Sequence, residues 1–559
     1  MDLNKNVIIS PYFKYSLHAL QRVITLTNTD KLSSSYGCSH RDYWLYKTSD
    51  FPDSVRNFSS HSFALASIHH YFESNQKLFF ADIAKASILF WAKTQHFDGS
   101  FDEFYPFERG WVGPTAFTLY SNIEAYKLIS DEFNSKEKNQ FFITVRKAAS
   151  YIALGDKEGD DLANHHAMAY LSLIKSYEIL QDEWLYKKAL EALNNYFKYN
   201  IYDEGWSIEY DGIDPGYLSA SCSFLSKTLE VVKNQEILEL IKTYSKTLKM
   251  FCYPDGCFAG PIGSRNTMHL YPFGFELLKG VDENIEYLAN FSRFSLNTGN
   301  NITPDIMSDR YIHYRVEEYL VTDKLFQSGK AKLDTPFEIQ KENKIYLPRA
   351  GIYHQINSNH FLTVNLAKQF VIDFYRTKNG TANYQRYSYT GIRILDKSGL
   401  YTSQFISKKT KYYKNKNKLV VKGYLGRVPT ENSFNLIKNL IFRSLLLFCS
   451  KSTRASNFLK KFIRKILMFS KNKQIYRLDA VFDLDNLILD INLFSDNSAN
   501  PVDIDLGTTI SDRYVPQSKF SRMSDFNLKQ SLLNKKTKEK FLKELKKNNQ
   551  VSFNLKLIE

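Results

Sequence analysis

The sequence contains little cysteine and no long run of apolar residues. Its five cysteines, among 559 residues, are odd in number and sparse, which excludes a disulfide framework. No run approaches the roughly 18 apolar residues that a membrane-spanning helix needs. The N-terminal stretch lacks the apolar core and the small-residue cleavage site of a signal peptide. We therefore expect the protein to stay in the cytoplasm.

The sequence is equally poor in metal-binding patterns. Cys252 and Cys257 flank a Tyr-Pro-Asp-Gly turn, but the further ligands that a metal site requires are not spaced around them. Buried thiols are the better interpretation of this pair. We expect neither a metal nor another cofactor.

Aromatic side chains, by contrast, are abundant. Aromatic residues make up 15% of the chain, with 37 Tyr and 42 Phe, while hydrophobic and charged residues contribute 43% and 24%. This balance is typical of a globular protein, and the length allows two domains with a large core. Some of the aromatic side chains are expected to line grooves.

Positive charge is concentrated in one stretch. The net charge is +15, and no acidic residue occurs between residues 438 and 477, which contain 11 Lys and Arg. Overlapping this stretch, residues 432–472 predict two short basic amphipathic helices. Such helices either attach to a membrane surface, here peripherally at the inner membrane, or pack on the protein with a solvated basic face. Nucleic-acid binding is disfavoured because no recognition motif accompanies the charge.

The first 332 residues predict a helical domain built from repeats. Apolar residues recur at helical spacing, for example in 62–74 and 166–180. Turns in which Gly follows acidic residues precede helices at residues 98–99, 203–205 and 255–256, and turns of this kind lie roughly 50 residues apart, the length of one helical hairpin. About six hairpins fit, enough to close an α/α toroid with its long loops on one rim.

Residues 333–559 predict a second, antiparallel β domain. The apolar pattern changes to a period of two, and Asn-Gly, Ser-Gly and Asp-Asn turns separate the runs. The fold class is therefore α+β, with a toroid at 1–332 followed by a β-sandwich at 333–559. The basic segment 432–472 interrupts this domain as a helical insertion.

The loops on the expected toroid rim supply candidate site residues. Residues 203–226 combine Asp-Gly turns, aromatic residues and carboxylates, and the inserted Asp-Gly-Ile-Asp-Pro-Gly-Tyr segment ends at Tyr217. Asn164, His165 and His166 begin a helix, where Asn164 is expected as the N-cap. Ordinary turn and capping roles remain the alternative for these residues.

This arrangement resembles the heparinase II/III-like and alginate-lyase-like polysaccharide lyases. The likeness rests on the toroid, the Asn164-His165 step, Tyr217 after an Asp-Gly loop, and the β domain. It implies β-elimination from an acidic, uronate-containing bacterial polysaccharide. The family also uses a His from its β domain in a His-Gly-His-type segment; here that region offers His354 and His360 without such a segment.

The elimination predicts a role for each catalytic candidate. The substrate carboxylate must be neutralised while a proton is removed from the adjacent carbon, which suits Asn164 and His165. Tyr217 is predicted as the base and then as the acid toward the leaving oxygen. Further substrate contacts are predicted for rim residues that are acidic, basic or aromatic: Glu103, Trp111, His166, Trp206, Asp211, Asp214, Arg265 and His269.

Two other functions remain open from the sequence. A toroid glycosidase would need two carboxylates as acid and base, with Asp98, Glu103, Asp211 and Asp214 as candidates. A non-catalytic or biosynthetic glycan-binding protein at a membrane fits the basic insertion. A near-ultraviolet absorbing product identifies the lyase, and reducing ends without that absorbance identify the glycosidase.

Overall fold

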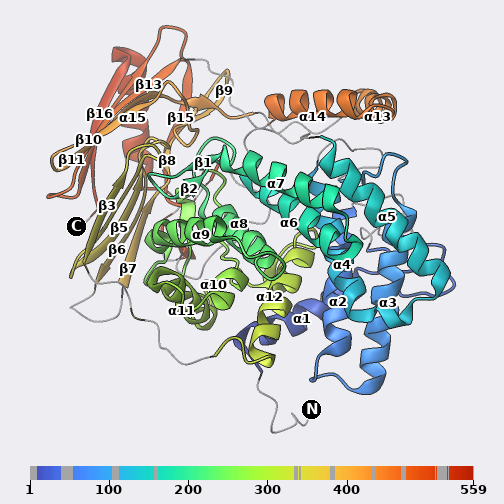
Figure 1. The fold of residues 1–559 in the computed structure, drawn as a ribbon. Coiled ribbons are helices and arrows are strands. Elements are labelled where there is room, and N and C mark those ends of the chain that lie inside the picture. The colour runs from blue at the N-terminus through green and yellow to red at the C-terminus, as the bar shows by residue number, and fades with distance from the viewer. Residues whose placement is uncertain are drawn as a thin grey trace.

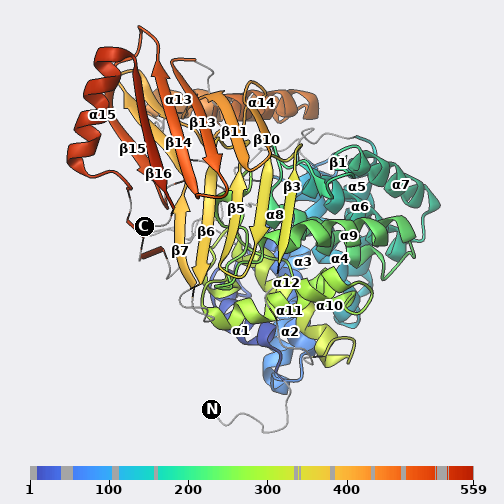
Figure 2. The same cartoon turned by 90° about the vertical axis from the view of Figure 1, so that its left-hand side faces the viewer.

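The computed structural model comprises a ring of helices beside a β domain (Figures 1 and 2). It describes residues 9–39, 54–103, 112–155, 162–332, 338, 342–377, 384–429, 435–467, 474–509, 511–512, 525–526, 528–529 and 531–557. The predicted α+β class, with a helical toroid followed by antiparallel β-sheets, is confirmed.

Twelve of the described helices form six packed pairs in two concentric layers, five of them consecutive hairpins and the sixth the pair of the last helix with the first. The inner layer contains α2 (Ser59–Ile68), α4 (Gly113–Ile129), α6 (Ala163–Leu180), α8 (Pro215–Thr228), α10 (Phe273–Leu277) and α12 (Ile312–Gln327). The outer layer contains α1 (Pro11–Thr25), α3 (Ser74–Lys93), α5 (Ser135–Ala153), α7 (Glu183–Phe197), α9 (Gln235–Leu248) and α11 (Glu283–Thr298). Each inner helix contacts the next, and α12 returns to α2, so the ring is closed.

Burial explains which helices lie inside. Helix α8 is buried over nearly its whole circumference, whereas the outer helix α9 buries one apolar stripe. Small residues let the inner helices approach closely: a Cβ atom at Gly274 of α10 would lie 2.6 Å from the Ser226 Oγ of α8. The all-round apolar pattern therefore marks the inner layer correctly.

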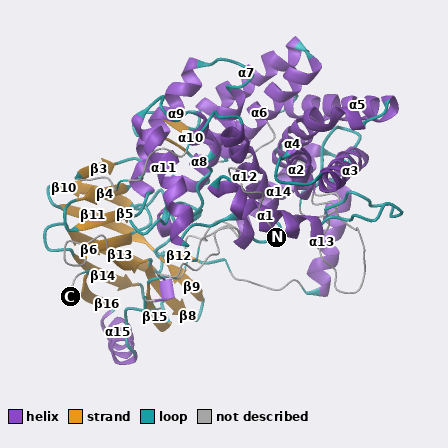
Figure 3. Ribbon diagram, turned by 90° about the horizontal axis from the view of Figure 1, so that it is seen from below, coloured by secondary structure: helices purple, strands orange, loops and turns teal. Residues whose placement is uncertain are grey.

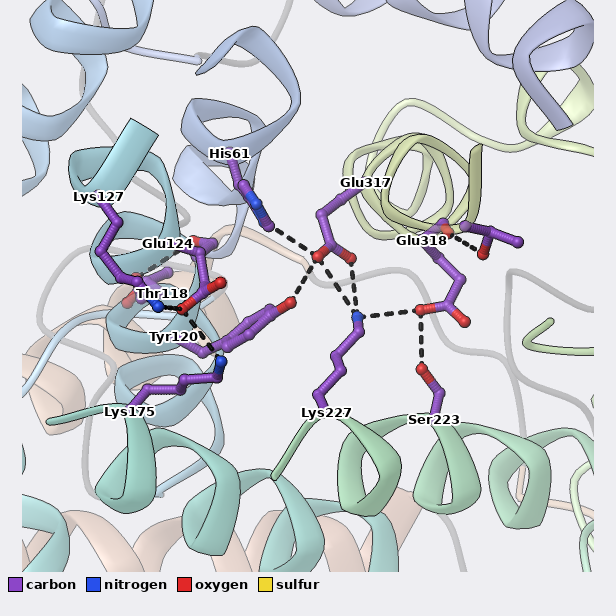
Figure 4. Close-up of polar contacts among 12 residues, drawn as sticks. His61, Thr118, Tyr120, Glu124, Lys127, Lys175, Ser223, Lys227, Glu317 and Glu318 are labelled. Atoms are coloured by element: carbon purple, nitrogen blue, oxygen red, sulfur yellow. Dashed lines mark hydrogen bonds and ion pairs between the residues drawn. The ribbon is translucent and has the colours of Figure 1, made fainter. Parts of the chain in front are cut away.

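A buried ionic cluster joins four inner helices at the centre of the ring (Figure 4). The Glu317 carboxylate of α12 accepts a hydrogen bond from Tyr120 of α4 at 2.8 Å and lies 3.0 Å from the Nδ1 of His61 on α2. Lys227 of α8 contacts Glu317 at 3.3 Å and Glu318 at 3.0 Å. All of these side chains are buried, so the cluster joins the last inner helix, α12, to the first, α2.

The repeated Asp-Gly turns act as scaffold. Gly99, Gly205 and Gly256 each have a positive φ, between 68° and 89°. Each glycine lies against an outer helix of a later hairpin, at Lys147 of α5, Thr243 of α9 and Thr298 of α11, where a Cβ atom would clash at 2.2 to 2.8 Å. The repeat seen in the sequence therefore corresponds to a repeated packing contact.

The described part of the β domain contains three antiparallel sheets. The first has the order β3 (Asn343–Leu347), β4 (Ile352–Ile356), β5 (His360–Asn365), β6 (Val371–Thr377) and β7 (Tyr384–Tyr389). The second has the order β10 (Lys411–Asn415), β11 (Lys418–Tyr424), β13 (Tyr476–Asp483), β14 (Ile488–Ser495) and β16 (Gln550–Lys556). The third has the order β12 (Gly426–Arg427), β9 (Gly399–Thr402), β8 (Gly391–Asp396) and β15 (Pro501–Gly507).

The three sheets share one apolar core. Strand β13 shows the expected alternation, with Tyr476, Leu478, Ala480 and Phe482 buried and the residues between them more exposed. Helix α15 (Lys535–Asn548) is charged on its surface and adds Phe541 and Leu545 to the same core. The change from helices to strands falls between Gln327 and Asn343.

The first sheet packs directly against the toroid rim. The buried Glu204, which follows the small strand β1 (Asn200–Ile201), accepts hydrogen bonds from the backbone N–H groups of Arg349 and Ala350. Farther along, the Lys368 ammonium donates to the Pro261 and Gly263 carbonyls at 3.0 and 2.6 Å. Two of the predicted rim loops are thus partly occupied by the domain interface.

The basic segment forms a helical hairpin, α13 (Leu436–Cys449) and α14 (Thr453–Leu467). Figures 1 and 3 show the hairpin extending from the β domain to the toroid. Among the described helices, none is long and apolar enough to cross a membrane. All five cysteines are free thiols, and Cys252 and Cys257 are buried as predicted.

Candidate active site at the mouth of the helical ring

The candidate site forms where the inner helices begin. Helices α4, α6 and α8 bring their first turns to one end of the ring, so that Gly113 lies against the His165 imidazole. Leu162, which precedes α6, forms a β-bridge with Glu209 in the loop before α8. The loops of successive hairpins therefore contact one another at this mouth.

Glu209 holds Asn164 in place. The Glu209 carboxylate accepts the Asn164 backbone N–H at 3.1 Å and its side-chain amide at 2.6 Å. Leu162, not Asn164, is the N-cap of α6. The predicted cap is therefore wrong, because a carboxylate from the next hairpin satisfies the free N–H group.

Burial keeps the Glu209 carboxyl group partly protonated at neutral pH. Loss of solvent raises the pKa of Glu209 to about 8, although the hydrogen bonds from Asn164 and the nearby His165 oppose this shift. A carboxyl group that holds its proton near neutrality can donate a hydrogen bond to a substrate anion. Glu209 was not among the predicted site residues; its position eight residues before Tyr217, in the same loop, is the available signal.

Asp214 positions Tyr217 and Arg265 together. It caps α8 by accepting the Tyr217 backbone N–H at 3.3 Å and accepts the Arg265 backbone N–H at 2.8 Å. The Tyr210 ring lies 6.4 Å from the Tyr217 ring, and the Arg265 guanidinium stacks over Tyr210 at 4.5 Å. Asp214 is fully engaged and buried, so its role is to position these residues; the predicted substrate contact is not supported.

The environment of Tyr217 favours the protonated phenol. Burial raises the pKa of Tyr217 well above its ordinary value, and the neighbouring Tyr210, Tyr311, Glu209 and Asp214 raise it further. The free protein therefore presents Tyr217 as a proton donor.

An aromatic wall continues from His165 around the mouth. The partly exposed His165 ring meets Phe117 edge to face at 5.7 Å, and Phe117 meets Tyr314 at 5.1 Å. Tyr311 lies next along α12, and the Arg310 guanidinium donates to its hydroxyl at 2.6 Å. The sequence analysis did not predict Tyr210 and Tyr311, because aromatic residues are too common in this sequence to single them out. It did not predict Arg310 either.

Several predicted contacts lie away from this mouth. Trp206 is 4% exposed and its indole N–H donates to Glu204 at 2.8 Å, so it cannot serve as a stacking platform. His269 is fully buried beside Tyr271, and burial lowers its pKa well below the ordinary value. The structure does not support a substrate contact for either residue, and Trp111 lies outside the described residues.

The other predicted contacts lie nearer the mouth. His166 is buried, stacks on Tyr199 at 4.7 Å and lines a cavity of about 290 Å³ between α5, α6 and α7 that His165 also lines. Asp211 is half-buried beside Tyr210 in the loop before α8. Glu103 is buried and contacts Arg310 at 3.5 Å and Lys460 at 3.4 Å.

The histidines of the β domain do not complete the site. His354 is fully buried in β4, with its Nδ1 3.1 Å from the Thr363 hydroxyl and its ring against Phe361. Burial lowers the pKa of His354 to about 3, which keeps the imidazole neutral. His360 pairs with Asn357 at a turn.

Three of the four carboxylates proposed for a glycosidase have structural partners. Asp98 accepts hydrogen bonds from Ser100 in its own turn, Glu103 forms ion pairs, and Asp214 caps a helix. The glycosidase alternative is therefore not favoured. Among the described residues, no group of three or more His, Cys, Asp or Glu side chains is placed to hold a metal ion.

Comparison with known proteins finds similarity to polysaccharide lyases. Residues 67–292 match the ulvan lyase N-terminal domain, whereas no curated protein sequence matches the chain. The structure of the Streptomyces coelicolor chondroitin AC lyase, in complex with chondroitin sulphate, is similar with a TM-score of 0.52 at 9% identity. That alignment covers 90% of this chain and 69% of that one.

Two further lyase structures are similar at a lower level. A Paenibacillus xanthan lyase gives a TM-score of 0.47 at 8% identity over 89% of this chain and 46% of that one. A heparan sulfate lyase from Pedobacter heparinus gives 0.38 at 10% identity over 90% and 71%. The match over residues 67–292 and the fold shared with the chondroitin AC lyase support the predicted likeness to the polysaccharide lyases.

Proposed function

We propose that this protein cleaves a uronate-containing polysaccharide by β-elimination at the mouth of the ring. The observation that supports the proposal is that Glu209 binds Asn164, beside His165, while Asp214 in the same loop binds the backbone N–H groups of Tyr217 and Arg265. In this reaction a proton leaves the carbon next to the carboxylate, a double bond forms, and the bond to the neighbouring glycosidic oxygen breaks. The departing oxygen takes up a proton.

The site offers hydrogen-bond donors and a positive charge that can neutralise the substrate carboxylate, as this chemistry requires. The amide of Asn164, held by Glu209, and the protonated fraction of Glu209 can share hydrogen bonds with the substrate carboxylate. Arg265 adds a positive charge on the other side of Tyr210. Preorganised donors of this kind stabilise the anion that develops in the transition state.

The two proton transfers are assigned to different residues. His165 is partly exposed at the mouth, and an imidazole can accept a proton near neutral pH. Tyr217 is kept protonated by its surroundings and therefore donates to the leaving oxygen. This assignment differs from the sequence prediction, in which Tyr217 served as base and acid and His165 neutralised the carboxylate.

The substrate is an acidic polysaccharide. Arg265 and Arg310 flank the aromatic wall, and the first turns of α6 and α8 present the positive ends of their helix dipoles to the same region. The matched family is named for ulvan, and the similar Streptomyces enzyme was solved with chondroitin sulphate. Both names support an acidic substrate for this chain.

A single assay series tests the proposal. The protein is incubated with a panel of uronate polysaccharides while near-ultraviolet absorbance and reducing ends are recorded. We expect both signals for the wild type and a loss of at least about 100-fold in kcat for Tyr217→Phe. The matched control Tyr413→Phe changes an exposed hydroxyl on β10 and keeps full activity.

The alternatives give other results. Reducing ends without absorbance would assign a glycosidase, and glycan binding with neither signal would assign a binding protein. Equal activity in Tyr217→Phe and wild type would remove Tyr217 from the chemistry.

A further inference from the structure

The hairpin α13–α14 exposes an unusual amount of apolar surface. Its large apolar side chains are between 43% and 75% exposed: Leu436, Ile437, Leu440, Ile441, Leu445, Leu447, Phe448, Phe458 and Phe462. Contiguous apolar patches on soluble monomers usually mark an interaction site. The hairpin therefore has an apolar face that the described part of the chain does not cover.

The hairpin is nevertheless attached to the toroid. Leu446, Ser450, Ser456 and Lys460 are buried, and the Lys460 ammonium lies 3.4 Å from the Glu103 carboxylate. Within the hairpin, the Ser456 hydroxyl donates to the Cys449 carbonyl at 2.9 Å. The alternative in which this segment packs its apolar face on the β-sheet does not describe the structure, since the large apolar side chains point outward.

The positive charge of the hairpin indicates which kind of partner it binds. Residues 435–467 contain no acidic residue, and Lys438, Arg443, Lys451, Arg454 and Lys461 are exposed. Apolar side chains among exposed cations are the signature of a helix that lies in the interface of an anionic membrane. A second copy of the hairpin would bring charges of the same sign together, which is unfavourable.

We propose that α13 and α14 dock the protein on an anionic lipid bilayer. The apolar side chains insert among the acyl chains at the headgroup boundary, and the lysines and arginines contact the anionic headgroups. The protein then acts as a peripheral membrane protein. This inference concerns a surface outside the candidate active site and does not rest on the proposed function.

The attachment connects the hairpin to residues beside the mouth. Glu103 binds Lys460 of the hairpin and Arg310, whose side chain contacts Tyr311 at the mouth. The docking face and the mouth are therefore linked through one buried carboxylate. If the proposed lyase activity holds, an acidic polysaccharide at the membrane surface is the substrate presented to this site.

Vesicle flotation with the full chain tests the docking. Vesicles of phosphatidylcholine alone are compared with vesicles of phosphatidylcholine and phosphatidylglycerol. We expect the wild type to float with the anionic vesicles and to be released by high salt. The double variant Leu440→Ser, Phe448→Ser should lose on the order of tenfold or more in bound fraction, and so should Lys438→Gln, Lys461→Gln.

Matched controls separate the hairpin from general surface effects. Leu32→Ser changes a side chain that is 97% exposed on the toroid, and Lys246→Gln changes an exposed lysine on α9; both should float like the wild type. All the altered hairpin residues are exposed, so thermal unfolding should be unchanged and a loss of flotation reports binding.

Three outcomes would overturn the inference. In the first, the wild-type protein does not float with anionic vesicles. In the second, the apolar variants float as well as the wild type. In the third, the wild type is a dimer without vesicles and the apolar variants are monomers. The last result would assign the face to a second copy of the chain. Activity on a soluble polysaccharide is measured separately, so a failure of docking and a failure of catalysis are distinguishable.

Discussion

Glu209 binds both nitrogen atoms of Asn164, the backbone N–H at 3.1 Å and the side-chain amide at 2.6 Å. This pair joins the start of α6 to the loop before α8, and so one carboxylate from a later hairpin determines the orientation of a predicted catalytic side chain. Its pKa of about 8 also couples the site to pH.

The first prediction concerns the pH dependence of stability. Because burial raises the pKa of Glu209 from 4.5 to about 8, the folded protein binds more protons than the unfolded chain between these values. The contribution of Glu209 to the free energy of unfolding is therefore fully present below about pH 4.5, and it is lost as the pH rises to about 8. Relative to the wild type, Glu209→Gln should become more stable between about pH 5 and about pH 9, by at most a few kcal/mol.

Thermal unfolding across this pH range measures the effect. The control Glu236→Gln replaces an exposed carboxylate on α9 and should show a constant difference from the wild type. A constant difference for Glu209→Gln as well would mean that Glu209 is ionised in the folded protein at neutral pH.

The second prediction concerns the proton acceptor. If His165 is the base, kcat/KM rises with pH as its imidazole loses its proton, which gives the profile an acidic limb. His165→Gln should lower kcat by roughly 100-fold or more and abolish this acidic limb of the profile. The alkaline limb should remain, since Tyr217 and Glu209 still titrate at higher pH.

A pH–rate profile on the best substrate of the panel distinguishes the assignments. His18→Gln, at an exposed position on α1, serves as the control and should reproduce the wild-type profile. A slower His165→Gln enzyme that keeps the acidic limb would return the role of base to Tyr217.

The sequence predicts the architecture better than the site, for physical reasons. The periods of apolar residues report on burial, which is a local property, and they identify both domains. The contact between Asn164 and Glu209 spans 45 residues and depends on ring closure. Asp-Gly turns likewise signal a loop, but whether that loop meets solvent or the β domain depends on packing, as Trp206 and Glu204 show.

The third prediction tests the ionic cluster at the centre of the ring. Removing Lys227 leaves Glu317 and Glu318 buried without their shared cation. Lys227→Met should therefore lower the free energy of unfolding by about 3 to 5 kcal/mol. The control Lys242→Met breaks a surface pair with Glu239 and should change it by less than about 1 kcal/mol.

Chemical denaturation compares the two variants. The Glu317→Gln change added to Lys227→Met should restore part of the lost stability, because it removes one uncompensated buried charge. Equal effects of Lys227→Met and Lys242→Met would show that the central cluster contributes no more than a surface ion pair.

The fourth prediction concerns the junction between the domains. Glu204 accepts hydrogen bonds from the indole of Trp206 and from the backbone N–H groups of Arg349 and Ala350, at a position that is 6% exposed. Glu204→Ala leaves three donors without this acceptor, two of them, at Trp206 and Ala350, buried. We expect a loss of about 2 to 4 kcal/mol, since each unsatisfied buried donor carries a desolvation cost.

The neighbouring Asp203 provides a control within the same turn. Its side chain is 63% exposed and pairs with the equally accessible Arg349 guanidinium at 3.0 Å. Asp203→Ala should therefore change stability by less than about 1 kcal/mol. If Glu204 joins the two domains, Glu204→Ala also separates one unfolding transition into two, measured by calorimetry. A single transition at the wild-type temperature would show that the remaining contacts, including those of Lys368, hold the domains together without Glu204.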